Sequence, residues 1–142
     1  MSRLREQPGA IVAPPTIMAG EIETELQVKL SAFITAVAGE NLSGNRVVRI
    51  NGADAFLADK DAVEASHAIG LTTGAALIST STTIQTDGVM TEGSWSWAVG
   101  PVWLGAAGLP TQTPPTTGAL VRIGTAIAPT KLVILPVFLA KL

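Results

Sequence analysis

The feature that most constrains this chain is the punctuation of short apolar runs by glycine and proline in residues 100–130. Runs of valine, isoleucine, leucine and tryptophan are interrupted there roughly every six to ten residues. Glycine and proline supply turn geometries that other residues adopt only at a cost. The stretch therefore predicts a small antiparallel β unit.

Few residues of this chain carry a charge. Charged residues make up 14% of the 142 residues and hydrophobic residues 47%, whereas soluble domains usually contain about 25% charged residues. Such a chain must bury much of its surface in a membrane or against protein. A spanning helix needs about 20 consecutive apolar residues, and Pro136 interrupts the longest candidate run. We therefore expect burial against other protein and no membrane partner.

The charges are also unevenly placed. Fifteen of the twenty charged residues precede His67, so threonine, serine, glycine and alanine cover much of the C-terminal half. Uncharged strands suit packing beside copies of themselves, because a charge is costly to desolvate. The net charge of −2 and the lack of a basic cluster argue against a nucleic-acid partner.

No catalytic, cofactor or metal site is predicted. The chain has no cysteine, and its single histidine, His67, has no serine nucleophile or second ligand in a recognisable pattern. Asp59, Asp61 and Glu64 lack the glycine and the terminal acid of a calcium loop, so we interpret them as a solvated turn. We expect a protein without enzymatic activity.

Three parts are expected along the chain. Residues 1–20 contain Pro8-Gly9 and Pro14-Pro15, which oppose helices and central strands, and are predicted to form an extended arm. The arm carries aliphatic side chains that predict an anchor on a neighbouring subunit, the alternative being a disordered tail: Ile11, Val12, Ile17 and Met18. Residues 21–37 are predicted to link the arm to the body, and residues 38–142 to form a β-domain.

The linking segment fits two templates. Polar and apolar residues alternate strictly from Glu21 to Ala32, which favours a long strand. Apolar residues also recur at spacings of three and four, as in a helix, so that alternative stays open. Whether the segment stays with its own subunit or crosses to another is also open.

The β-domain has clear turn signals. Asn51-Gly52 and Asp87-Gly88 are both typical of hairpin turns, and residues 131–136 should pair with residues 120–127. Val137, Phe138 and Leu139 are too apolar to remain in water, so we predict that they dock on the same subunit or a neighbour. The expected fold is all-β: a compact antiparallel β-sandwich or barrel-like domain with an extended N-terminal arm.

Three tryptophans need separate interpretations. Trp95 and Trp97 are predicted to lie on the same side of a strand. There they would wall the core or an interface, or alternatively form a platform for a glycan. Trp103, between Val102 and Leu104, is predicted to lie in the core.

Several phrases of the sequence resemble a small β module of tailed-bacteriophage structural proteins. They are Ala38-Gly39-Glu40-Asn41-Leu42-Ser43, Val47-Val48-Arg49-Ile50-Asn51-Gly52, His67-Ala68-Ile69-Gly70-Leu71-Thr72, Trp95-Ser96-Trp97, Gly100-Pro101-Val102-Trp103-Leu104-Gly105, Thr111-Gln112-Thr113-Pro114-Pro115 and Val121-Arg122-Ile123-Gly124-Thr125-Ala126-Ile127. The resemblance spans residues 38–136, and its most distinctive elements are the order of the phrases and the string at residues 111–115.

The resemblance implies a head-decoration, head-fibre or tail-fibre protein, a class that is usually homotrimeric and without enzymatic activity. From it we expect a homotrimeric capsid decoration (cement) or head-fibre protein attached through its N-terminal arm. Its partners would be itself and the major capsid protein or another virion protein, on a virion assembled in the host cytoplasm. The alternative is a tail-fibre or baseplate adhesin module that binds host-surface glycan.

Overall fold

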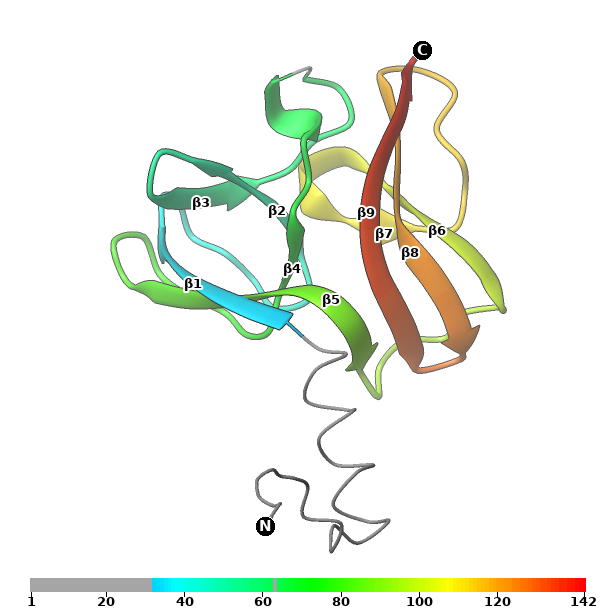
Figure 1. The fold of residues 1–142 in the computed structure, drawn as a ribbon, viewed down its shortest axis with the longest axis horizontal. Helices are drawn as coiled ribbons and strands as arrows, with labels where there is room; N and C mark the ends of the chain where they lie inside the picture. Colours follow the sequence, from blue (N-terminus) through cyan, green and yellow to red (C-terminus); the bar gives the residue numbers. More distant parts are fainter. Residues whose placement is uncertain (1–31, 63) are drawn as a thin grey trace, which may run out of the picture.

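The structure is a computed structural model that describes residues 32–62 and 64–142, and this part of the chain is all-β, as predicted (Figure 1). Its elements are, in chain order, β1 (Ala32–Ala38), β2 (Val47–Asn51), β3 (Asp54–Leu57), the 3₁₀ turn η2 (Glu64–Ser66), β4 (Gly70–Thr72), β5 (Ser81–Thr91), β6 (Gly100–Leu104), the 3₁₀ turn η3 (Ala106–Gly108), β7 (Pro110–Thr111), β8 (Ala119–Ala128) and β9 (Lys131–Lys141). The predicted arm with Ile11, Val12, Ile17 and Met18 lies outside the described residues, as do residues 21–31 of the linking segment.

Five strands close into a ring, which confirms the barrel-like prediction. Neighbouring strands follow the order β1-β3-β2-β4-β5, and β5 pairs with β1 to complete the circuit. The β1–β5 pair is antiparallel from Ala32, opposite Asp87, to Val37, opposite Ser81. The β1–β3 pair is parallel and short, joining Val37 to Asp54 and Ala38 to Ala55. The described part of the predicted linking segment is therefore a strand.

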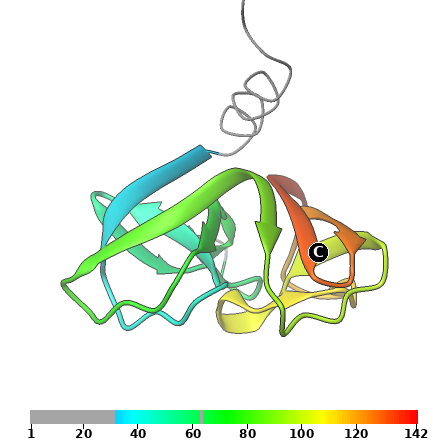
Figure 2. The same ribbon diagram turned by 90° about the horizontal axis from the view of Figure 1, so that it is seen from below.

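The second half of the sheet continues from β5 through β9, β8, β6 and β7. Figure 2 shows β5 reaching across both halves of the molecule. β8 and β9 form the hairpin predicted from the sequence, with Pro129 and Thr130 in the turn and pairing that extends from Ala128–Lys131 to Ala119–Lys141.

The predicted turn at Asp87-Gly88 is wrong, because β5 runs through it as one strand. Gly88 has a φ of 85° and bends the strand where its partner changes: Asp87 lies opposite Ala32 and Gly88 opposite Ile134. The buried Gln85 side chain holds the bend, since its Nε2 donates to the carbonyl oxygens of Asp87 at 3.0 Å and Val89 at 3.1 Å. The bend lets one strand take part in both halves of the sheet.

The predicted hairpin at Asn51-Gly52 is confirmed, but its turn is placed one residue later. Asn51 pairs with Asp54, so Gly52 and Ala53 are the central residues. Gly52 has a φ of 67°, and Asn51 is not among the residues with positive φ. Positive φ at the first central position is the mark of a type II′ turn, rather than the type I′ turn that Asn-Gly favours.

Two hydrophobic clusters lie on either side of the wall formed by β2 and β4. The cluster inside the ring comprises Ala38, Leu42, Val48, Ala55 and Ile84. The larger cluster lies under the second half of the sheet and comprises Val47, Ala58, Leu71, Met90, Val102, Leu104, Ala119, Val121, Ile123, Ala126, Leu132 and Ile134. The adjacent residues Val47 and Val48 belong to different clusters because successive side chains of a strand point to opposite faces.

Candidate interaction surface

The β8–β9 hairpin turns an apolar face to solvent. Leu132 and Ile134 point into the core. Because side chains alternate along a strand, the residues that alternate with them on β9 point outward. Leu135 is 61% exposed, Val137 41% and Leu139 51%. We call the outer face the set of exposed aliphatic residues on β9 and its neighbours β5 and β8: Val89, Ile127, Leu135, Val137 and Leu139.

A bulge in β9 shapes this face. Arg122 pairs with Val137 and Gly124 with Ile134, so two residues of β9, Leu135 and Pro136, oppose one residue of β8. Proline has no N–H to donate, and within sheets it is confined to edges and bulges. Because the pairing of β9 with β5 also ends at Ile134, the far half of β9 has no neighbouring strand on that side within the described residues.

The outer face contains a hollow of about 340 Å³ between β8 and β9. It is lined by Arg122, Gly124, Thr125, Leu135, Val137 and Leu139. A side chain at Gly124 would run into the backbone carbonyl of Val133, so only glycine permits the two strands to lie this close. The hollow therefore lies over two closely paired strands, with Leu135, Val137 and Leu139 as its aliphatic walls.

Arg122 is the one charged residue in that lining. Its Nη2 donates to Thr125 Oγ1 at 2.6 Å and its Nε to the carbonyl oxygen of Gly124 at 3.4 Å. Within residues 32–62 and 64–142, no carboxylate forms an ion pair with it. The guanidinium is thus held in place by neutral acceptors, and its charge is uncompensated by the described part of the chain.

The structure divides the predicted C-terminal docking residues between two sides of β9. Val137 and Leu139 belong to the outer face, whereas Phe138 lies opposite the buried Val121 and points the other way. Its ring stacks on His67, with centroids 5.3 Å apart and planes 25° apart. His67 lies in the loop before β4, so this contact joins segments far apart in sequence, and no local pattern predicted it.

Trp95 and Trp97 lie in the loop between β5 and β6, not on the predicted strand. The loop is held by backbone bonds from Trp95 N to Glu92 O at 3.1 Å and from Trp97 N to Pro129 O at 2.9 Å. The two rings contact each other at 5.4 Å with a 48° tilt, and both are half-buried against the larger core cluster. Both rings therefore cover part of the core, and part of each ring stays exposed to solvent.

Two polar side chains fasten this loop. Gln112 bonds both backbone groups of Ala98: its Oε1 accepts from the N–H at 3.0 Å, and its Nε2 donates to the carbonyl at 2.6 Å. The amide side chain thereby replaces a neighbouring strand. At the other end, the Ser94 hydroxyl and backbone N–H donate to Glu92 at 2.7 and 3.1 Å, which lowers the pKa of that carboxyl below its ordinary value.

The predicted core position of Trp103 is wrong. Val102 and Leu104 are fully buried, and Trp103 points to the opposite side of β6, where it is half-buried. It pairs with Arg122, so it borders the outer face rather than the core. Three consecutive apolar residues gave no alternation from which the sequence could reveal this.

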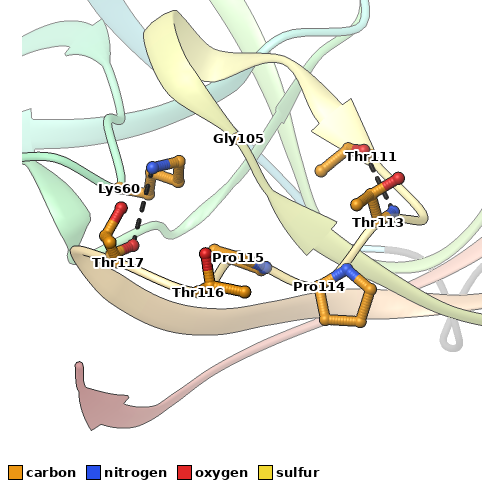
Figure 3. Close-up of a pocket in the computed structure, with 8 residues that line it drawn as sticks. All are labelled: Lys60, Gly105, Thr111, Thr113, Pro114, Pro115, Thr116 and Thr117. Atoms are coloured by element: carbon orange, nitrogen blue, oxygen red, sulfur yellow. Dashed lines mark hydrogen bonds between the residues drawn. The ribbon is translucent and has the colours of Figure 1, made fainter.

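A second hollow of about 340 Å³ lies beside the string at residues 111–115 (Figure 3). It is lined by Lys60, Gly105, Thr111, Thr113, Pro114, Pro115, Thr116 and Thr117. The Lys60 ammonium, its one charged group, pairs with Asp61 at 2.6 Å and reaches the Thr117 carbonyl at 3.5 Å. Threonine and proline walls around an already paired ammonium offer no acid–base pair for catalysis.

Within the described residues, no three His, Cys, Asp or Glu side chains lie together in a way that could hold a metal ion. Within the same residues, no helix is long and apolar enough to cross a membrane.

In comparisons with known proteins, no protein-family model, no curated protein and no solved structure matches this chain. The molecule is therefore characterised by its fold and its surface alone: an all-β body with an exposed aliphatic face.

Proposed function

We propose that this protein is a non-enzymatic structural component of a bacteriophage virion. It would be a homotrimeric capsid decoration or head-fibre protein attached through its N-terminal arm. The observation that carries the proposal is the outer face, whose five large aliphatic side chains lie on three adjacent strands and are exposed to solvent. An exposed apolar surface of this kind is typical of a protein–protein interface.

The energetics favour burial of this face by other protein. Burying an exposed valine, leucine or isoleucine completely contributes about 1.5–3 kcal/mol. Since the five side chains of the outer face are already partly covered, roughly 1 kcal/mol each is left to gain on association. The desolvation cost falls on one group, because Arg122 is the only charge in the lining of the hollow, and a carboxylate from the partner would offset that cost.

The placement on a virion rests on the resemblance of residues 38–136 to tailed-phage structural modules. The string at residues 111–115 is the most distinctive part of that resemblance. It has a structural role here, since Gln112 holds the loop that carries Trp95 and Trp97. On this proposal the partners are other copies of the chain and the major capsid protein or another virion protein.

Two measurements test the proposal. Light scattering on the purified protein should give three times the 14.6 kDa of one chain, with little dependence on salt because the interface is apolar. Added to particles that lack the protein, it should bind to their heads, as seen by electron microscopy. A monomer at every salt concentration would overturn the trimer, and particles that never take up the protein would overturn the virion role.

A second candidate is a tail-fibre or baseplate adhesin that binds host-surface glycan. It is favoured by the contact between Trp95 and Trp97 in a loop whose neighbours Ser94, Ser96 and Ala98 are exposed. Replacing both tryptophans with alanine would then abolish binding to host cells while the assembly keeps its mass. Loss of folding in that variant would instead assign both rings to the core.

A further inference from the structure

We expect a segment of protein to cover the outer face, and the charges of the chain indicate which segment. Every charged residue of the β8–β9 hairpin is basic: Arg122, Lys131 and Lys141. Residues 21–31, which directly precede β1, contain Glu21, Glu23 and Glu25 and the single base Lys29. The segment is therefore acidic, the hairpin is basic, and Arg122 has no carboxylate partner among the described residues.

The apolar residues of the same segment complement the hollow. Ile22 and Leu26 fall on one side of the segment in either a strand or a helix. The hollow offers Leu135, Val137 and Leu139 as walls, and its 340 Å³ is ample for aliphatic side chains. Hydrophobicity and charge thus match between two parts of one sequence.

The position of β1 indicates that the match is made between copies. β1 pairs with β5 before the bend at Gly88 and β9 pairs with β5 after it, so Ala32, opposite Asp87, lies beside the Gly88–Ile134 pair. Val137 and Leu139, which line the hollow, lie farther along β9, beyond the end of its pairing with β5. Figure 1 shows β9 ending at the C-terminus, at the opposite side of the molecule from the start of β1.

We propose that residues 21–31 of one copy dock on the outer face of a neighbouring copy, with Ile22 and Leu26 at the hollow and the glutamates near Arg122. This deepens the proposed function, because it names the surface and the segment that join the subunits. Each copy donates one segment and receives one, and such a head-to-tail exchange closes into a ring when the rotation is threefold.

The absence of cysteine from the chain makes the proposal directly testable. Two full-length variants, Leu26→Cys and Val137→Cys, are refolded together and treated with a short bismaleimide, which tolerates small differences in register. A cross-link between the two different chains should appear as a doubling of mass on a denaturing gel. Leu77→Cys is the matched control, because Leu77 is also exposed, at 69%, but lies outside the outer face.

Each alternative occupant has its own result. A double variant, Leu26→Cys with Val137→Cys, that cross-links only within one chain would overturn docking between copies. Val137→Cys that cross-links with itself would show that the face meets its own equivalent, which also contradicts the proposal. Light scattering on the same samples separates the failures: a trimer without the cross-link refutes only this inference, whereas a monomer refutes the proposed assembly as well.

Discussion

Gly118 shows how a single residue lets the start of β8 and the end of β9 pack against the loop that follows β3. Its φ is 79°, and a Cβ there would collide with the carbonyl of Lys60, which accepts from Ala119 N at 2.7 Å. Its own carbonyl accepts from Leu142 N at 2.7 Å. Gly118 therefore tolerates no side chain.

Gly118→Ala should lower the free energy of unfolding by about 1–3 kcal/mol, the cost of forcing an L-residue into that backbone conformation. Chemical denaturation monitored by tryptophan fluorescence measures it. Gly74→Ala is the control, since a Cβ there meets nothing within 4 Å and the φ is not positive. Equal stabilities for the two variants would contradict the account of Gly118.

Glu92 provides a prediction of pH dependence. The Ser94 hydroxyl and N–H bond to its charged form, so its pKa in the folded protein lies below the unfolded value. A depressed pKa means that the contribution to stability is present above the unfolded pKa and is lost as the pH falls through the folded pKa. Titration by NMR should show Ser94→Ala raising the pKa of Glu92 toward the ordinary glutamate value, and an unchanged pKa would refute these bonds.

Residue-level features were the least predictable from the sequence. Asp87-Gly88 has the composition of a turn, but tertiary pairing with β1 and β9 keeps β5 continuous and uses the glycine for a bend. The His67–Phe138 stack joins residues distant in sequence, so it has no local signal. The Asn51-Gly52 dipeptide did locate a hairpin, because its turn needs only local geometry.

At the scale of elements, the loop between β5 and β6 depends on one side chain from the string at residues 111–115. Gln112 donates to and accepts from Ala98, as a neighbouring strand would. The sequence marked this string as distinctive without revealing its role, since the partner lies fourteen residues earlier.

Gln112→Leu should lower the free energy of unfolding by roughly 1–3 kcal/mol, because both polar groups of Ala98 lose their partner. The emission of Trp95 and Trp97 should shift to longer wavelength as the loop loosens. Gln112→Glu is the comparison, since it keeps the acceptor for the Ala98 N–H and removes only the donor to the Ala98 carbonyl. No difference between wild type and Gln112→Leu would show that the loop is held by its backbone bonds.

The β8–β9 hairpin was predictable because apolar runs flank a proline-containing turn, and the structure confirms it. The direction of its side chains was not. The bulge at Leu135 and Pro136 changes the pairing with β8, and unbroken apolar runs in β9 carry no alternation that separates an outer face from the core. The sequence therefore indicated that the C-terminus must be covered, while the geometry identified which residues need covering.

At the scale of the whole molecule, the low charge content leaves apolar side chains exposed in several places, and the outer face is one of them. The ring buries its own core, and so does the second half of the sheet. Among the apolar side chains that stay exposed, those of the outer face lie around one arginine that has no carboxylate partner within the described residues. On the proposed function, other copies of this chain cover that face.

Comparing the molecular mass in solution of the wild type and of a Leu135→Glu, Val137→Glu variant tests this claim most directly. Both side chains point to solvent in the single copy, so the variant should fold, as circular dichroism would verify. We predict a wild-type mass of three chains and a variant mass of one, because two carboxylates on the outer face would have to be desolvated on association. A wild type that stays monomeric, or a folded variant that stays trimeric, would contradict the account.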